Sequence, residues 1–187
     1  MRIVGGTLSG RKIEPPLSLV TRPMMDRVRE SLFNVLAHRD WGPELGDLFE
    51  AEINVLDAFC GTGALAFESL SRGAAQATLF DKDQQALMIA KKNAATLGLT
   101  SRCNILMGDA TQPPRATKQC ALVFLAPPYR KGLIPPALAA LDQAGWIAKH
   151  AVIVAETAKK EELPALEGFP LLLQRFYGDT GLHFMAR

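Results

Sequence analysis

Apolar and polar positions along this chain repeat in two periods, and from residue 53 onward a strand-like period alternates with a helical one. The strand period predicts strands at 53–57, 76–81, 102–107, 119–125 and 150–156. The helical period predicts helices at 64–72, 83–97 and 132–144. Regular alternation of this kind is typical of an α/β fold, a doubly wound and mostly parallel sheet with helices on both faces.

The pattern changes after Pro164. Two strand-like runs, 171–177 and 182–185, flank the turn sequence 178–181, Gly-Asp-Thr-Gly. Glycine and aspartate favour the tight turns that join antiparallel strands. We therefore expect an antiparallel hairpin that closes one edge of the sheet.

The first 52 residues follow a different pattern. Short apolar runs at 2–4 and 11–13 surround a glycine-containing turn and predict a small β-hairpin. A helix is expected to open at Thr21-Arg22-Pro23, with Pro23 in its first turn and an apolar stripe that runs from Met25 to Leu36. Residues 39–52 predict an irregular linker. We expect an extension at 1–52 that packs on a main domain at 53–187.

Composition narrows the class of protein. The chain has 187 residues, of which 48% are hydrophobic, enough for one substantial core. It has no apolar run of eighteen residues and no apolar signal-peptide core near its start, so we expect a cytoplasmic protein. We also expect a monomer. Its three cysteines and three histidines are scattered, which argues against disulfides and against a metal site.

Charge is unevenly distributed along the chain. Residues 1–39 carry seven Lys or Arg and three Asp or Glu, a balance of +4, whereas the remainder carries fourteen against sixteen, a balance of −2. A basic extension on a nearly neutral body suits a polyanionic partner such as RNA. Ordinary solvated arginines explain the same charge equally well.

The turn after the first predicted strand of the main domain has the chemistry of a cofactor site. The strand ends on Asp57, and Gly61 and Gly63 follow before the helical pattern begins. Glycine lets the backbone approach a ligand where a Cβ would clash, and the free N–H groups of a helix start point at the same place. Without a ligand, an uncompensated acid at a buried strand end would be costly.

Two cofactors compete for this turn. Gly61-x-Gly63-x-x-Ala66 matches the dinucleotide fingerprint, and Asp81 lies twenty positions after Gly61, where a ribose-binding acid belongs. Asp57, however, would repel a pyrophosphate and attract an ammonium group. S-adenosylmethionine carries an amino group and a cationic sulfur and therefore suits Asp57 better, while an NAD-dependent dehydrogenase is the alternative.

Further polar or special residues follow the next predicted strands. Asp81, with Asp83 nearby, ends the second strand, and Asp109-Ala110 follows the third. Asp81 can accept hydrogen bonds from both ribose hydroxyls. Asp109 can accept one from an adenine amino group while the backbone of Ala110 contacts the ring. Three acids at the ends of three consecutive strands indicate one cofactor pocket at that edge of the sheet.

These motifs carry a resemblance to a known family. Asp57-x-Phe59-x-Gly61-x-Gly63, followed by Asp81, Asp109 and Pro-Pro-Tyr, resembles a class I S-adenosylmethionine-dependent methyltransferase. The Pro-Pro-aromatic element is similar to that of enzymes that methylate exocyclic amino groups of bases. The N-terminal part closely resembles the bacterial 16S ribosomal RNA guanine-N2 methyltransferase family, RsmD type. Three segments carry that likeness: Arg2-Ile3-Val4-Gly5-Gly6, Gly10-Arg11-Lys12, and Thr21-Arg22-Pro23 through Asn34.

The resemblance implies a fold and an activity. It implies strand order 3-2-1-4-5-7-6 and methyl transfer from S-adenosylmethionine to N2 of one guanine in 16S rRNA within an assembling small subunit. The base would be flipped out of its stack and its N2 held in line with the methyl group. In the family, the first residue of an Asp/Asn-Pro-Pro-aromatic motif and the next carbonyl accept hydrogen bonds from the amine, and the aromatic ring stacks on the base. The matching residues here are Ala126, Pro127, Pro128 and Tyr129.

Ala126 departs from the family pattern, because it offers a methyl group where the family carries a carboxylate or an amide. Loss of a charged hydrogen bond, worth roughly 1.5–3 kcal/mol, predicts methyl transfer roughly ten- to hundredfold slower. Cofactor binding should change little. The sequence therefore leaves open a weakened enzyme, an inactive cofactor-binding ribosome-assembly factor, and an amino-methyltransferase for another nucleic acid.

Several basic residues are candidates for RNA phosphate contacts. For Arg22 the resemblance implies an alternative role, a contact with the cofactor carboxylate, because the N-terminal motif of related methyltransferases faces that group. Arg130 and Lys131 directly follow the motif that would bind the base. Any one of these side chains can also be an ordinary surface residue. The candidates are Arg11, Lys12, Arg22, Arg27, Arg29, Arg130 and Lys131.

Overall fold

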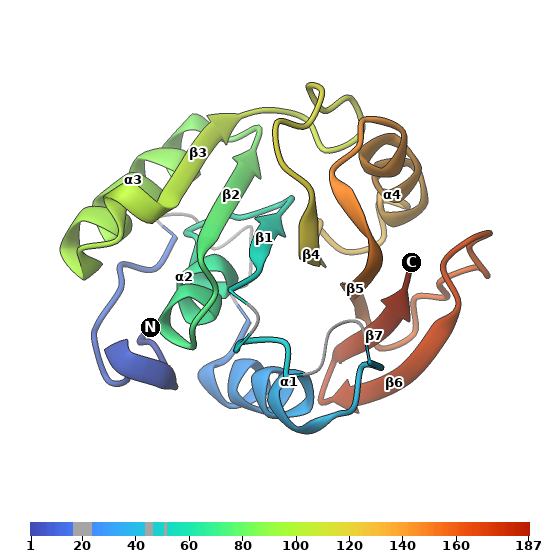
Figure 1. Cartoon of the computed structure of the whole chain (residues 1–187), viewed down its shortest axis with the longest axis horizontal. Coiled ribbons are helices and arrows are strands. Elements are labelled where there is room, and N and C mark those ends of the chain that lie inside the picture. The colour runs from blue at the N-terminus through green and yellow to red at the C-terminus, as the bar shows by residue number, and fades with distance from the viewer. Residues whose placement is uncertain (17–23, 44–46, 51) are drawn as a thin grey trace.

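A seven-stranded sheet forms the centre of the molecule, with strand order β3-β2-β1-β4-β5-β7-β6 (Figure 1). The computed structural model describes residues 1–16, 24–43, 47–50 and 52–187. Pairing is parallel from β3 to β5 and antiparallel on both sides of β7, which confirms the order implied by the family resemblance. The strands are β1 (Asn54–Asp57), β2 (Gln76–Asp81), β3 (Cys103–Met107), β4 (Cys120–Leu125), β5 (Ile147–Ala158), β6 (Leu171–Tyr177) and β7 (Thr180–Ala186).

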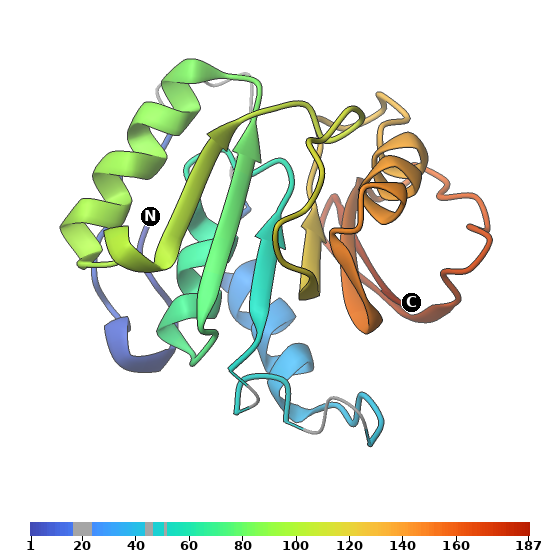
Figure 2. The same ribbon diagram turned by 45° about the horizontal axis from the view of Figure 1, so that its top comes forward.

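Helices cover both faces of this sheet (Figure 2). Apolar side chains of α1, α2 and α3 pack with Val55 and Phe124 on one face, and those of α4 pack with Leu56 and Val123 on the other. Consecutive strand residues thus point to opposite faces, as the continuous apolar runs require. None of the described helices is long and apolar enough to cross a membrane. The helices are α1 (Asp26–His38), α2 (Ala64–Ser71), α3 (Gln84–Leu97) and α4 (Ile134–Gln143), with short 3-10 turns η1 (Gly6–Leu8) and η2 (Thr100–Arg102).

Predicted and observed elements of the main domain agree in type and order, and most boundaries shift by one or two residues. Strand β5 is the main exception, because it begins at Ile147 and ends at Ala158. In the described residues α1 begins at Asp26, and Met25 before it is extended (φ −60°, ψ 145°). The helix start predicted at Thr21-Arg22-Pro23 lies outside the described residues.

The predicted N-terminal hairpin exists in a short form. Arg2 and Lys12 form a single antiparallel bridge, and Ile3 N donates to the carbonyl of Arg11 at 2.9 Å. Between them the chain turns through η1 and hydrogen-bonds to α2, because Leu8 N donates to Ser71 Oγ at 2.9 Å. Contacts with α2 thus take the place of a longer strand ladder.

The extension and the main domain share one hydrophobic core. Ile3, Leu32 and Phe33 are fully buried in the same cluster as Val55 and Phe67. The hydrophobic core is therefore continuous between the two parts. The boundary predicted at residue 52 corresponds to a change in the sequence pattern.

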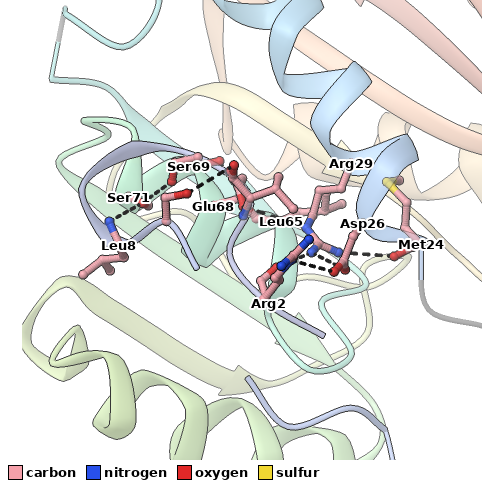
Figure 3. A network of polar contacts seen from close by, with 12 residues as sticks. Arg2, Leu8, Met24, Asp26, Arg29, Leu65, Glu68, Ser69 and Ser71 are labelled. Carbon is pink, nitrogen blue, oxygen red and sulfur yellow. Dashed lines mark hydrogen bonds and ion pairs between the residues drawn. The ribbon is translucent and has the colours of Figure 1, made fainter. Parts of the chain in front are cut away.

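A buried polar network joins the extension to α2 (Figure 3). The side chain of Arg29 is completely buried, donates to Asp26 Oδ1 at 2.8 Å and to the carbonyl of Arg2, and lies 3.9 Å from Glu68 Oε2. Glu68, also fully buried, accepts hydrogen bonds from Val4 N and from Arg72 Nε, each at 2.9 Å. Paired in this way, the charges are compensated inside the fold.

Candidate cofactor and base-binding site

The carboxyl ends of β1, β2, β3 and β4 bring the predicted acids, the glycine turn and the Ala-Pro-Pro-Tyr motif to one edge of the sheet. Strand order reverses between β1 and its neighbour β4, so the loops that follow these two strands diverge at this point. Ligands of doubly wound sheets bind in the crevice that such a reversal creates. The glycine turn follows β1 and the Ala-Pro-Pro-Tyr motif follows β4, so the fold places both motifs at the switch point.

Asp57, the last residue of β1, has one buried carboxylate oxygen without a donor. Only 1% of it is exposed, and its Oδ2 accepts a weak hydrogen bond from Ala66 N at 3.3 Å. Among the described residues, no group donates to its Oδ1. Burial raises the pKa of Asp57 to about 7, the Ala66 N–H opposes this, and the carboxyl groups of Asp81 and Glu156 add to it. A buried oxygen without a donor is costly, and a ligand ammonium would satisfy it.

The two glycines of the turn have different structural roles. Gly61 has φ +51°, and a Cβ there would meet nothing within 4 Å. Gly63 has φ +83° and precedes α2, and its Cβ would lie 2.4 Å from the Phe67 ring. Gly63 is therefore needed for packing between the turn and α2, whereas Gly61 leaves open space for a ligand. Phe59, between Asp57 and Gly61, is half-buried and packs on the α4 side of the sheet.

Asp81 links the glycine turn to the end of β2. Its Oδ2 accepts a hydrogen bond from Gly61 N at 2.8 Å, and its Oδ1 accepts one from Asp83 N at 2.9 Å. Asp83 in turn accepts from Gln85 N at 2.8 Å as the N-cap of α3. A carboxylate oxygen can accept more than one hydrogen bond, so Asp81 keeps acceptor capacity for a ligand.

Asp109 is held by its own turn. Its Oδ1 accepts from Thr111 N at 2.9 Å and Thr111 Oγ1 at 2.7 Å, and Lys82 Nζ lies 2.6 Å from its Oδ2. Partial desolvation raises the pKa of Asp109, but the donors from Lys82 and Thr111 together outweigh it and lower the pKa. The neighbouring Ala110 is buried. The adenine contact expected of Asp109 stays a prediction that would use its remaining acceptor capacity.

The motif after β4 is fastened to the ends of β5 and β7. Ala126 and Tyr129 are half-buried, Pro127 is buried, and Pro128 is exposed. The Tyr129 hydroxyl donates to Glu156 Oε1 at 2.5 Å and lies 3.2 Å from Thr180 Oγ1.

The backbone after the motif is also fixed. Arg130, with φ +59°, donates its backbone N–H to Glu161 Oε1 at 2.9 Å, and Glu161 Oε2 accepts from Ala158 N at 3.1 Å. Sequence reasoning missed Glu156, Thr180 and Glu161. Glu156 ends the apolar run 151–155, and the strand-end rule that identified Asp57 would have found it too.

Asn93 is a further missed residue. It is buried on α3, and its amide nitrogen donates to the carbonyls of Thr62, at 3.1 Å, and Glu14, at 3.2 Å. Its Oδ1 accepts from Glu14 N at 2.7 Å. One side chain thus joins the segment that follows the N-terminal hairpin to the glycine turn.

The predicted phosphate contacts fall into different classes. Arg11, Lys12, Arg27, Arg130 and Lys131 are exposed, and Arg11 donates to the carbonyl of Thr96 at 2.8 Å. The prediction for Arg29 is corrected, because its side chain is buried in the network with Asp26 and Glu68 and cannot reach a phosphate at the surface. Arg22 lies outside the described residues.

Two other kinds of chemistry find little support at this edge. Burial raises the pKa of Cys60 well above its usual range, so the thiol is protonated and is a poor nucleophile. Among the described residues, no three His, Cys, Asp or Glu side chains gather as metal ligands do. The arrangement therefore consists of an acid-lined cradle beside a rigidly held aromatic loop.

Comparison with known proteins bears on this arrangement. The family model described as "Conserved hypothetical protein 95" matches residues 1–186. Ribosomal RNA small subunit methyltransferase D of Escherichia coli K12 is 37% identical over 166 residues, covering 89% of this chain and 79% of the relative.

Solved structures show the same fold. The structure of yhhF from Escherichia coli, described as a candidate methyltransferase, superposes with a TM-score of 0.80 at 34% identity and covers 100% of this chain and 97% of that one. An RNA methyltransferase of Salinibacter ruber in complex with S-adenosyl-L-homocysteine has a TM-score of 0.65 over 88% of this chain and 93% of that one. At 13% identity, this second likeness concerns the fold alone.

Proposed function

Because the chain belongs to the ribosomal RNA small subunit methyltransferase D family, we propose that it transfers a methyl group from S-adenosylmethionine to N2 of a guanine in 16S rRNA. Two observations carry the cofactor part: a buried Asp57 oxygen has no donor among the described residues, and the space at Gly61, four residues later in the same turn, is open. That pair suits an ammonium-bearing ligand. The substrate would be the small ribosomal subunit or its assembly intermediates, met in the cytoplasm by a monomer.

The residues present fit the cofactor. Asp57 would pair with the amino group of the methionine end, and the Gly61 backbone would lie against it. Asp81 would accept from the ribose hydroxyls, and Asp109 with the Ala110 backbone would bind the adenine. When bound, the cofactor would supply a methyl group activated by its sulfonium; the thioether would be the leaving group of the transfer to the amine, and the amine proton would be released to water. The protein's task is then to orient the two partners.

The base would be held by the loop after β4. The Tyr129 ring would stack on the flipped guanine, and the Pro127 carbonyl would accept from its amino group, with Pro128 shaping the turn. Arg130 and Lys131 would contact the flanking phosphates, with Arg11, Lys12 and Arg27 as further phosphate contacts. Supporting this, Tyr129 is fixed at both its hydroxyl and the following peptide, so its ring is held in one orientation before RNA binds.

Ala126 favours a second candidate, a cofactor-binding assembly factor with little or no turnover. The side chain of Ala126 is a methyl group, so the first position of the motif offers the amine no side-chain acceptor. This alternative shares the cofactor site and the RNA surface with the first. Only turnover separates the two functions.

The test is transfer of labelled methyl from S-adenosylmethionine to small subunits isolated from cells that lack this activity. Wild-type protein and the Ala126→Asp variant are assayed side by side, and the methylated base is identified in the digested RNA. Transfer to guanine N2 by the wild type supports the enzyme. Transfer by Ala126→Asp alone supports an assembly factor silenced at one residue. No transfer by either variant, or a methyl group on a different base, would overturn the proposed substrate.

A further inference from the structure

Glu156 lies beside the base-binding motif because of the register between β4 and β5. Leu125 pairs with Ala155, so the following residues, Ala126 and Glu156, are neighbours across the two strands. Asp57 pairs with Phe124, which pairs with Val154, and positions two residues apart along a strand face the same side. Asp57, Ala126 and Glu156 are therefore on one face of the sheet, at its ligand-binding edge.

Glu156 is built as a buried acceptor for one donor. It is 8% exposed, and its Oε1 accepts a hydrogen bond from the Tyr129 hydroxyl at 2.5 Å. Burial raises the pKa of Glu156, and the hydrogen bond from Tyr129 partly offsets this. Thr180, at the start of β7, adds a second polar contact to the same hydroxyl at 3.2 Å. The tip of the Tyr129 ring is thus tied to two strands.

We propose that Glu156 is a positioning residue for the substrate base, which it orients by holding the Tyr129 ring through the hydroxyl. Holding the Tyr129 ring is especially important in this chain, because Ala126 offers no side-chain acceptor that could orient the amine directly. Stacking on Tyr129 and the Pro127 carbonyl must then align the base with the methyl group. This inference rests on the proposed function, and its test is chosen so that the two can fail separately.

A double-mutant cycle measures the coupling. Tyr129→Phe, Glu156→Gln and the double variant are compared with wild type in methyl transfer to small subunits. Each single change is expected to lower kcat about tenfold, since the hydrogen bond that holds the Tyr129 ring is lost, while the KM for S-adenosylmethionine stays within about twofold. The double variant should be no slower than either single variant, because both remove the same bond. Multiplying effects, or unchanged single variants, would overturn the proposal.

Two controls separate positioning from a general structural effect. Glu162→Gln alters an exposed neighbour and should leave kcat unchanged. In an Ala126→Asp background the amine gains its own acceptor, so the loss caused by Glu156→Gln should shrink to about threefold or less. A loss of the same size in both backgrounds would indicate that Glu156 acts only on the fold.

A second readout needs no turnover. The chain has two tyrosines, so in a Tyr177→Phe background a fluorotyrosine label reports Tyr129 alone by fluorine NMR. Glu156→Gln is expected to shift this resonance and change its width as the ring gains freedom, and Glu162→Gln should leave it in place. An unmoved resonance in Glu156→Gln would overturn the positioning role. If wild type transfers no methyl to small subunits, the proposed function fails, and the resonance still decides whether Glu156 holds Tyr129.

Discussion

The backbone N–H of Gly61 donates to Asp81 Oδ2 at 2.8 Å, so the turn after β1 is fixed by the carboxylate that ends β2. Two residues twenty positions apart thus form one rigid edge, with open space where a Gly61 side chain would be. The glycine provides the space and the acid sets the shape of the turn. A site organised in this way is formed before its ligand arrives, which lowers the entropic cost of binding.

Removing the Asp57 charge is expected to weaken cofactor binding. In Asp57→Asn the size is kept but the ion pair with the ligand ammonium is lost, and the dissociation constant of S-adenosylhomocysteine should rise roughly ten- to hundredfold. Isothermal titration calorimetry measures it, with the exposed Glu167→Gln as control. Unchanged affinity in Asp57→Asn would rule out the assigned ammonium contact.

Stability of the ligand-free protein should fall as pH rises through neutrality. Burial raises the pKa of Asp57 to about 7, above the value of about 4 expected in the unfolded chain. Between these values the folded state binds the extra proton, so the free energy of unfolding decreases with rising pH across that window. Glu156, whose pKa is also raised by burial, acts in the same direction.

Urea unfolding at a series of pH values tests this slope. The slope between pH 5 and 7.5 should be shallower in Asp57→Asn, which has no proton to lose at that position. The affinity for S-adenosylhomocysteine should increase as the pH rises toward 8, because the ammonium group of the ligand pairs with the ionised Asp57 carboxylate. Identical slopes in the two proteins would show that Asp57 does not titrate in this range.

The two glycines of the turn should respond differently to alanine. Gly63→Ala places a Cβ 2.4 Å from the Phe67 ring and should destabilise the fold by about 2 kcal/mol or more. Gly61→Ala meets no neighbour, although its φ of +51° adds modest strain, so it should fold and lose affinity for the cofactor instead. Thermal unfolding and calorimetry on both variants check this, and a reversed pattern would contradict the assigned roles.

Arg27 and Arg29 lie two residues apart on α1 but should give opposite phenotypes. Arg29→Ala removes a buried cation from Asp26 and Glu68 and should cost about 3–5 kcal/mol of stability. Arg27→Ala, at an exposed position, should leave the melting temperature unchanged. It should weaken binding to small subunits and reduce the salt dependence by about one phosphate contact. Unchanged RNA affinity and salt slope in Arg27→Ala would exclude it as a phosphate contact.

The sequence by itself determined the order of elements and which acids lie at the strand ends. Alternation of apolar runs is a local signal, and parallel strands with helical crossovers leave few arrangements open. Asp57, Gly61, Asp81 and Asp109 follow strand ends, and strand ends of a parallel sheet meet at one edge whatever the details of packing. These positions could be predicted because they depend only on residues close by in the chain.

Tertiary structure alone decided which polar groups meet and which are buried. The bond between Tyr129 and Glu156 depends on the register of β4 with β5, and the contact of Asn93 with Thr62 depends on how α3 packs. Arg29 looked like a surface cation in the sequence, yet Glu68, thirty-nine residues away, compensates its charge in the core. Whether a side chain is buried, and with which group it pairs, depends on how segments distant in the sequence pack together. A local sequence pattern contains no information on that packing.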